Sequence, residues 1–170
     1  TVVINNIDDG IYEGDETVIV DISSVTNGLE NGAQQVTYTI EEDDSAPTVT
    51  IAADPISISE AAETSRITVT LSAVAEVDVT IPIEFTGDAV LATDYNFVDD
   101  PISSFIIVPG STSLFVDLIS ITNEIVDGDR DIVVILGTLI NGTPGSKLSL
   151  INNLCCQRLL TSGYRVLSDH

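Results

Sequence analysis

An internal repeat constrains the fold of this chain more than any other feature of its sequence. At an offset of 114 residues, a loop, the strand pattern after it and the turn after that align without a gap. The aligned positions are Asp9 with Asn123, Glu13 with Asp127, Gly14 with Gly128, Asp15 with Asp129, Val18–Val20 with Ile132–Val134, and Asn27-Gly28 with Asn141-Gly142. Such self-similarity indicates copies of one structural unit. We therefore interpret residues 1–44 as the second half of one unit, 45–47 as a linker and 48–150 as the next unit, in a chain that is part of something longer.

Alternation of apolar and polar residues predicts that both units are built from β-strands. Residues that alternate with a period of two place their apolar side chains on one face of a sheet. The pattern predicts strands over 1–7, 18–24, 36–40, 48–52, 56–59, 67–71, 77–85, 105–108, 114–121 and 132–136. No helix of about ten residues or more is predicted before residue 147. Many short strands at regular spacing are typical of an all-β antiparallel sandwich.

The loop between the first two predicted strands is strongly acidic. Five carboxylates fall between Asp8 and Glu16, interrupted by Gly10 and Gly14. This concentration of negative charge is unfavourable unless water or a cation compensates it. Calcium prefers six to eight oxygen ligands, which carboxylates and backbone carbonyls supply. The loop alone therefore leaves two interpretations open, a calcium site or a solvated acidic hairpin.

The composition excludes several classes of function. Asp and Glu number 27 against 5 Lys and Arg, which gives a formal net charge of −22. Nucleic acids and anionic membrane surfaces both attract positive charge, so neither is an expected partner. No apolar stretch approaches the length of a transmembrane helix. His170 is terminal and alone and the serines have no base to activate them, so an enzyme is not predicted.

Four motifs follow one another along the chain: the acidic loop with its strand (residues 8–20), the strand end Ile40-Glu41-Glu42-Asp43-Asp44, the element Thr93-Asp94-Tyr95, and the turn Val108-Pro109-Gly110-Ser111-Thr112. Together and in this order they resemble the Calx-β domain family, whose members occur in sodium/calcium exchangers and in tandem arrays of cell-surface proteins. The resemblance covers residues 1–44 and 47–142. It implies a seven-stranded immunoglobulin-like β-sandwich that holds calcium (Ca²⁺) in loops at one end.

The resemblance also implies the residues that would bind calcium. In the first unit these are Asp8, Asp9, Glu13, Glu16, the backbone carbonyl of Ile11, and the closing acids Glu42, Asp43 and Asp44. In the second unit they are Glu60 and Asp94, with Asp127 at the position aligned with Glu13. The alternative for Glu60 and Asp94 is that both are ordinary exposed loop acids.

The second unit departs from this pattern. Thr122 and Asn123 stand where the first unit has its paired aspartates, and Arg130 stands where it has Glu16. A cation at that position opposes calcium binding. The first site is therefore the stronger candidate, although its unit lacks the front half that would supply its own equivalents of Glu60 and Asp94.

We therefore expect a calcium-binding structural or adhesive module of a secreted or cell-surface multi-repeat protein. Calcium would stiffen the joint at residues 41–47 by screening acids that otherwise repel one another. The expected partners are calcium and neighbouring Calx-β-like repeats, with a cell-surface protein or glycan as a further candidate. The alternative is a regulatory calcium sensor of a membrane transporter or signalling protein. A carbohydrate-binding module would want exposed aromatic residues, which the pattern places mostly in strands.

The tail over residues 151–170 differs from the rest of the chain. Lys147, Arg158 and Arg165 outnumber Asp169 after Gly145, and the alternation fades after Leu150. Two interpretations stay open, a non-native segment such as one from a shifted reading frame, or a short native helix over residues 153–160.

Overall fold

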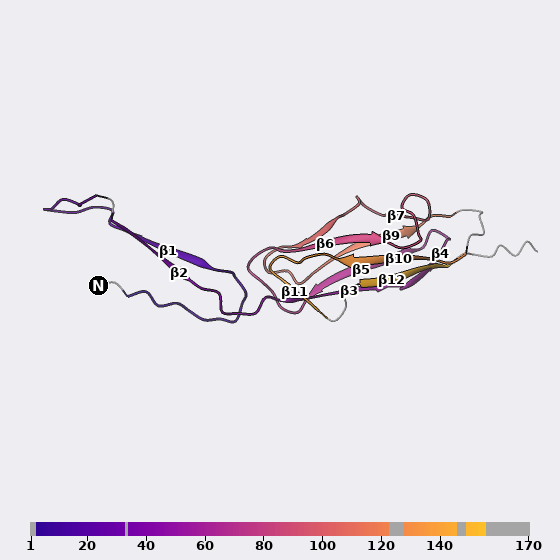
Figure 1. Cartoon of the computed structure of the whole chain (residues 1–170), viewed down its shortest axis with the longest axis horizontal. Coiled ribbons are helices and arrows are strands. Elements are labelled where there is room, and N and C mark those ends of the chain that lie inside the picture. The colour runs from indigo at the N-terminus through magenta and orange to yellow at the C-terminus, as the bar shows by residue number, and fades with distance from the viewer. Residues whose placement is uncertain (1–2, 33, 123–127, 146–148, 156–170) are drawn as a thin grey trace, which may run out of the picture.

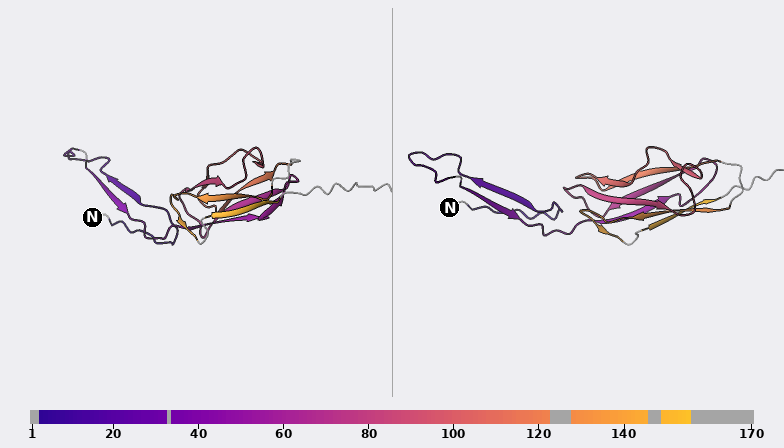
Figure 2. Two further views of the ribbon diagram at one scale, coloured as in Figure 1. Left: turned by 45° about the vertical axis from the view of Figure 1, so that its right-hand side comes forward. Right: turned by 45° about the horizontal axis from the view of Figure 1, so that its top comes forward.

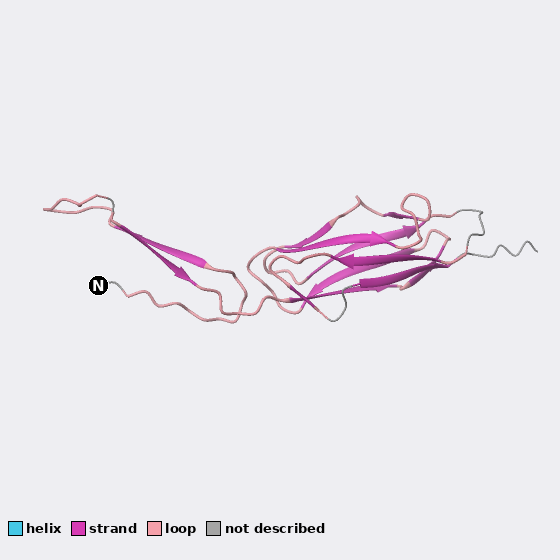
Figure 3. Cartoon of the chain, in the orientation of Figure 1, coloured by secondary structure: helices cyan, strands magenta, loops and turns pink. Residues whose placement is uncertain are grey.

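The computed structural model describes residues 3–32, 34–122, 128–145 and 149–155, and over these residues it contains strands but no helix (Figures 1 and 3). The twelve strands are β1 (Glu16–Asp21), β2 (Gln35–Ile40), β3 (Thr48–Asp54), β4 (Ser57–Ser59), β5 (Thr64–Leu71), β6 (Val79–Thr86), β7 (Tyr95–Phe97), β8 (Ser104–Ile107), β9 (Ser113–Ser120), β10 (Arg130–Leu136), β11 (Thr143–Pro144) and β12 (Ser149–Cys155).

The second unit is a sandwich of two five-stranded sheets. One sheet has the order β4-β12-β10-β6-β8 and the other has the order β11-β3-β5-β9-β7. All pairs in these sheets are antiparallel except β12 with β4 and β11 with β3. The predicted all-β, immunoglobulin-like antiparallel sandwich is thus confirmed. Its strands number ten rather than seven because the short strands β4, β7 and β11 are formed as well.

The core of the sandwich follows from the alternation in its strands. In β6, Val79 and Ile81 are fully buried while the alternating residues Thr80 and Pro82 are partly exposed. The same alternation buries Ile67 and Val69 of β5 against them. Burial of one such β-branched side chain contributes about 1.5–3 kcal/mol, so the inward positions of the central strands account for most of the stability of this unit.

The backbone confirms the internal repeat at its predicted offset. In the first unit β1 pairs with β2 so that Glu16 lies opposite Ile40, and in the second unit β10 pairs with β12 so that Arg130 lies opposite Leu154. The preceding glycines share a left-handed conformation, with φ of 80° at Gly14 and 85° at Gly128. The two strand pairs are therefore the same structural element in consecutive copies.

The first unit differs because, over its described residues, no further strand pairs with either side of this strand pair. Among the described residues β1 and β2 form a two-stranded ribbon that lies apart from the sandwich (Figures 1 and 2). Val20 in the ribbon is 41% exposed, whereas its equivalent Val134 is 0% exposed because β6 and the opposite sheet cover it. The ribbon therefore exposes an apolar face that is buried at the equivalent positions of the second unit.

Several local predictions were wrong. The strand predicted over 1–7 is not formed over residues 3–7, which pair with no strand in the part of the chain that the structure describes. The helix considered for 153–160 is not formed over 153–155, which belong to β12, and 156–160 lie outside the described residues. β12 continues past Leu150, where the alternation fades, because it pairs with β10 on one side and β4 on the other. The unit boundaries themselves stay a prediction.

Candidate metal centre at the joint between the units

The register of the ribbon brings two acidic segments to the same place. Because Glu16 at the start of β1 lies opposite Ile40 at the end of β2, the residues before β1 and after β2 emerge at one end of the ribbon. That end faces the second unit, to which the chain passes through Pro47 into β3 (Figure 1). The acidic loop and the acidic strand end therefore meet at the joint between the units.

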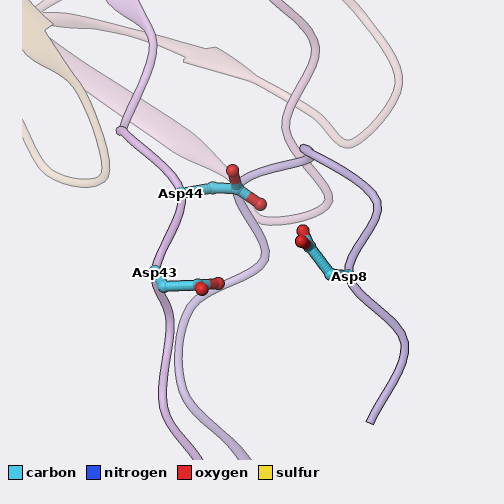
Figure 4. Close-up of side chains that lie close together, drawn as sticks. All are labelled: Asp8, Asp43 and Asp44. Atoms are coloured by element: carbon cyan, nitrogen blue, oxygen red, sulfur yellow. The ribbon is translucent and has the colours of Figure 1, made fainter.

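Three carboxylates converge there most closely. One oxygen each from Asp8, Asp43 and Asp44 lies within 4.8 Å of the others. Figure 4 shows the carboxylates of Asp8 and Asp44 facing one another, with Asp43 beside them. Asp8 comes from the loop before β1, and the other two come from the segment after β2. Three carboxylates brought together from two segments make an arrangement typical of oxygen ligands around a cation.

A hollow of about 70 Å³ lies at this cluster. Eight acids line it, and no Lys, Arg or His is among the described residues of its lining. They are Asp8, Asp9, Glu13, Glu16, Glu41, Glu42, Asp43 and Asp44, together with Asn6 and Ile11. The hollow can hold an ion with some of its water, and every charged group around it favours a cation.

Glu42 fastens the two acidic segments to each other. Its Oε2 accepts hydrogen bonds from the backbone N–H groups of Glu13 (2.5 Å) and Gly14 (2.6 Å), and its Oε1 accepts one from Asp44 (2.8 Å). The backbone N–H groups of Asp44 and Gly14 are the main reason that the pKa of Glu42 lies below its ordinary value. These hydrogen bonds favour the ionised form of Glu42. The ionised carboxylate links the two acidic segments and so positions the acids around it.

Two further side chains shape the loop itself. Asp9 Oδ1 accepts a hydrogen bond from the Ile11 backbone N–H (3.0 Å), which closes a turn over Gly10 at φ 82°. Asp15 Oδ1 accepts one from the backbone N–H of Glu42 (2.9 Å). An L-residue with a side chain resists the positive φ that this turn requires, so the glycine is needed to bend the acids around the hollow.

The electrostatics of the cluster fit a hard cation. Burial raises the pKa of Asp44 above its ordinary value, and the nearby charges of Asp43 and Glu42 raise it further. Asp8 and Asp9 add to this repulsion. A bound divalent cation would reverse the effect, because an opposite charge near a carboxylate favours its ionised form. The donors are oxygen atoms only, the set that Ca²⁺ prefers and that softer metals do not.

The acidic loop also touches the second unit. The backbone carbonyl of Tyr12 accepts a hydrogen bond from the Glu76 backbone N–H (3.0 Å), and Tyr12 forms a parallel bridge with Ala75. The Tyr12 side chain is half-buried against the core of the second unit. Beside it the carboxyl groups of Glu13 and Glu76 are hydrogen-bonded, which raises the pKa of Glu13. The candidate centre is thus in direct contact with the neighbouring sandwich.

The second unit arranges its corresponding residues differently. Glu60 and Asp94 are not exposed loop acids, since they are only 5% and 2% exposed. Arg130 Nη1 lies 3.5 Å from Asp94 Oδ2 and donates to the Asp88 carbonyl (3.2 Å). Asp127 lies outside the described residues.

The structure brings every candidate of the first unit to one hollow, from Asp8 and Asp9 to Asp43 and Asp44. The sequence pattern did not indicate the contributions of Asn6 and Glu41, or the contact of Glu76 with Glu13. Asn6 and Glu41 adjoin the predicted acids in sequence, which is a usable signal. Glu76 carries no such signal because it reaches the joint only through the folding of the second unit. That these residues bind calcium stays a prediction.

The fold and this centre define a class of protein: an antiparallel β-sandwich module with an acid-rich centre where consecutive units join. The family model described as the Calx-beta domain matches residues 1–44 and 42–153. The chain therefore belongs to the Calx-beta family, which confirms the resemblance. The family and fold fit a calcium-related β-sandwich module, and the family is not one of catalytic domains.

Solved structures of Calx domains are similar to this chain in fold. The apo form of the Calx CBD1 domain is 13% identical with a TM-score of 0.50, and the similarity covers 65% of this chain and 99% of that one. CBD12 from CALX1.2 is 13% identical with a TM-score of 0.51, over 64% of this chain and 44% of that one. The calcium binding domain CBD12 of CALX1.1 gives 13% and 0.50, over 63% and 44%. At this identity the similarity shows the fold alone.

No curated protein matches the chain. Over the residues that the structure describes, no helix is long and apolar enough to cross a membrane.

Proposed function

We propose that the acids at the joint bind calcium and that the bound ion fastens the first unit to the second. The observation that carries this proposal is the convergence of Asp8, Asp43 and Asp44 within 4.8 Å from two chain segments. Asp8 and Asp43 are exposed and Asp44 is partly buried, so each pair of these charges repels by about 1 kcal/mol or somewhat more, and a cation among them would turn this repulsion into attraction. Calcium supplies that charge and takes oxygen ligands without demanding a strict geometry.

The roles of the remaining candidates follow from their contacts. Asp9, Glu13, Glu16 and the Ile11 carbonyl line the same hollow and complete the oxygen ligands that calcium needs. Both carboxylate oxygens of Glu42 accept hydrogen bonds from backbone N–H groups. The main role of Glu42 is therefore to hold the acidic loop and the strand end together. Membership of the Calx-beta family supports a calcium role for this set of acids.

The ion would act on the joint through the acidic loop. Tyr12 fastens the middle of this loop to Ala75 and Glu76 of the second unit, two residues from Gly14 and its bond to Glu42. Calcium that orders the loop therefore also fixes the surface on which the second unit rests. Without calcium the repulsion among the acids opposes the same arrangement.

This mechanism favours a structural module in a tandem array, on a secreted or cell-surface protein, with neighbouring repeats as its partners. Calcium would keep consecutive units in one orientation, and a cell-surface protein or glycan would be bound by the array. The alternative is a regulatory sensor of a membrane transporter. The contact of Tyr12 across the joint favours that role as well, because a change in the loop reaches the next unit directly.

Calorimetric titration with calcium tests the binding. We expect one class of site in this chain, lost in the double variant Asp43→Asn, Asp44→Asn. A matched control is the double variant Asp99→Asn, Asp100→Asn, which removes two charges from an exposed loop of the second unit and should leave the binding heat unchanged. Equal binding by the two double variants would overturn the proposal.

A further inference from the structure

The second unit carries a cation of its own at the position that the repeat assigns to a calcium ligand. Arg130 begins β10 as Glu16 begins β1, and the two occupy the same place in the strand register, opposite Leu154 and Ile40. The substitution therefore inverts one charge in an otherwise conserved backbone arrangement. The end of the sandwich where this occurs is opposite to the joint (Figure 1).

The guanidinium of Arg130 points into this end of the sandwich. The Arg130 side chain is 30% exposed and the Asp94 side chain is 2% exposed, with 3.5 Å between Nη1 and Oδ2. Arg130 Nη1 also donates to the Asp88 carbonyl at 3.2 Å. The Val90 backbone N–H donates to the same Oδ2 of Asp94 at 2.7 Å, so this carboxylate is fixed in place.

A second buried carboxylate belongs to the same end. Glu60 is 5% exposed and lies in the turn between β4 and β5. Ser120 at the end of β9 fastens this turn, since its Oγ donates to the Ser59 carbonyl (2.6 Å) and accepts from the Glu63 backbone N–H (3.0 Å). The next residue, Ile121, donates its backbone N–H to the Asp94 carbonyl (2.8 Å).

Buried carboxylates at one end of a domain require positive charge nearby. Removal of an ionised carboxylate from water costs far more than folding can offset unless the charge is paired. In the first unit the proposed partner is a metal ion. In the second unit the positive charge is a guanidinium that belongs to the chain itself.

We propose that Arg130 replaces the metal ion in the second unit, so that its guanidinium closes this end of the sandwich without calcium. The two ends of the second unit then differ in kind: the joint depends on calcium, and the far end does not. This difference between the two ends rests on the proposed function of the joint, whereas the role of Arg130 does not depend on it.

The test measures thermal unfolding of the whole chain in a silenced background, in which Asp43→Asn and Asp44→Asn abolish calcium binding at the joint. In this background calcium should not change Tm. Arg130→Gln should lower Tm in chelator by about 5 °C or more, because it removes the charge that pairs with Asp94. Arg130→Lys should retain most of the stability, because it keeps the charge. Equal melting of the Gln and Lys variants at the parent Tm would overturn the proposal.

A charge reversal tests the replacement itself. Arg130→Glu restores the residue type of the first unit, so we expect a lower Tm in chelator that calcium raises again, with no such rescue for Arg130→Gln at the same calcium concentration. A rise in the parent Tm with calcium in the silenced background would contradict the proposal, since it would show a metal bound beside the arginine. If the unsilenced chain binds no calcium, the proposed function fails, and the comparison of Gln with Lys in chelator still decides the role of Arg130.

Discussion

The ribbon of the first unit and the complete sandwich of the second contain the same strand pair with different surroundings. β1–β2 and β10–β12 share their register and the left-handed glycine before them. In the sandwich, β6 and β4 flank the pair on its two sides, whereas over the described residues the ribbon has no third strand. The local sequence pattern therefore sets the pairing of these strands, while stability comes from the strands and sheet that cover them.

The largest effect we expect comes from one substitution made at equivalent positions of the two units. Val134→Ala removes two methyl groups from a fully buried site and should lower the free energy of unfolding by about 2 kcal/mol. Val20→Ala, at a site 41% exposed, should cost less than about 1 kcal/mol. Urea unfolding followed by circular dichroism measures both. Equal costs would mean that the ribbon is covered in solution, which would break the comparison.

The contact across the joint should have a smaller effect. Tyr12→Ala removes a half-buried side chain that packs against the core of the second unit, and it should lower calcium affinity by several-fold because the acidic loop loses this contact. Tyr38→Ala is the matched control, since Tyr38 is 55% exposed on the ribbon. Calcium titration of both variants makes the measurement. If the two variants lose affinity equally, Tyr12 does not link the joint to the second unit.

An ion pair on the sandwich should contribute stability that depends on pH and not on calcium. Arg66 forms two hydrogen bonds of 2.8 Å to Asp117 and stacks 3.8 Å above the ring of Phe115. The hydrogen bonds from Arg66 hold the pKa of Asp117 below its ordinary value of 3.8. Because the pKa of Asp117 is lowered in the folded protein, the ion pair stabilises the fold fully at pH values above the ordinary pKa of this group. The stabilisation is lost as the pH falls through the lowered pKa.

Asp117→Asn should therefore cost about 0.5–1 kcal/mol at pH 7, since the arginine is half exposed, and clearly less near pH 2, because the pH then falls toward the lowered pKa of Asp117. Calcium should not alter either value, because the pair lies on the sandwich sheet and not at the joint. Unfolding of the variant and the parent at both pH values, with and without calcium, checks this. A cost that is as large at pH 2 as at pH 7 would assign the effect to packing on Phe115 and not to charge.

Much of this molecule could be predicted from its sequence because the relevant physics is local. Alternation around Ile67 and Ile81 defines strands, and the offset of 114 residues defines the repeat. The acids of the joint were predictable because they adjoin strand ends that pair with each other. What sequence did not reveal depends on distant neighbours: Glu76 reaches the joint only after β5 and β6 have folded, and residues 3–7 form no strand without a partner.

Arg130 is a residue whose charge could be predicted from the sequence but whose surroundings could not. Its position in the repeat already indicated a charge that opposes calcium. Its sequence position did not reveal that the guanidinium lies against a carboxylate only 2% exposed, which depends on the loop that carries Asp94. Charge at a repeat position is thus readable from sequence, whereas burial and pairing require the fold.

The central claim is that calcium at the joint fixes the two units relative to each other. Fluorescence energy transfer tests it most directly, with one dye on the ribbon at Asn31 and one on the sandwich at Ser103, measured in calcium and in chelator. We predict a narrow distance distribution in calcium that broadens in chelator, and no change with calcium in the Asp43→Asn, Asp44→Asn variant. Distributions that are identical in calcium and chelator for the parent chain would contradict the account.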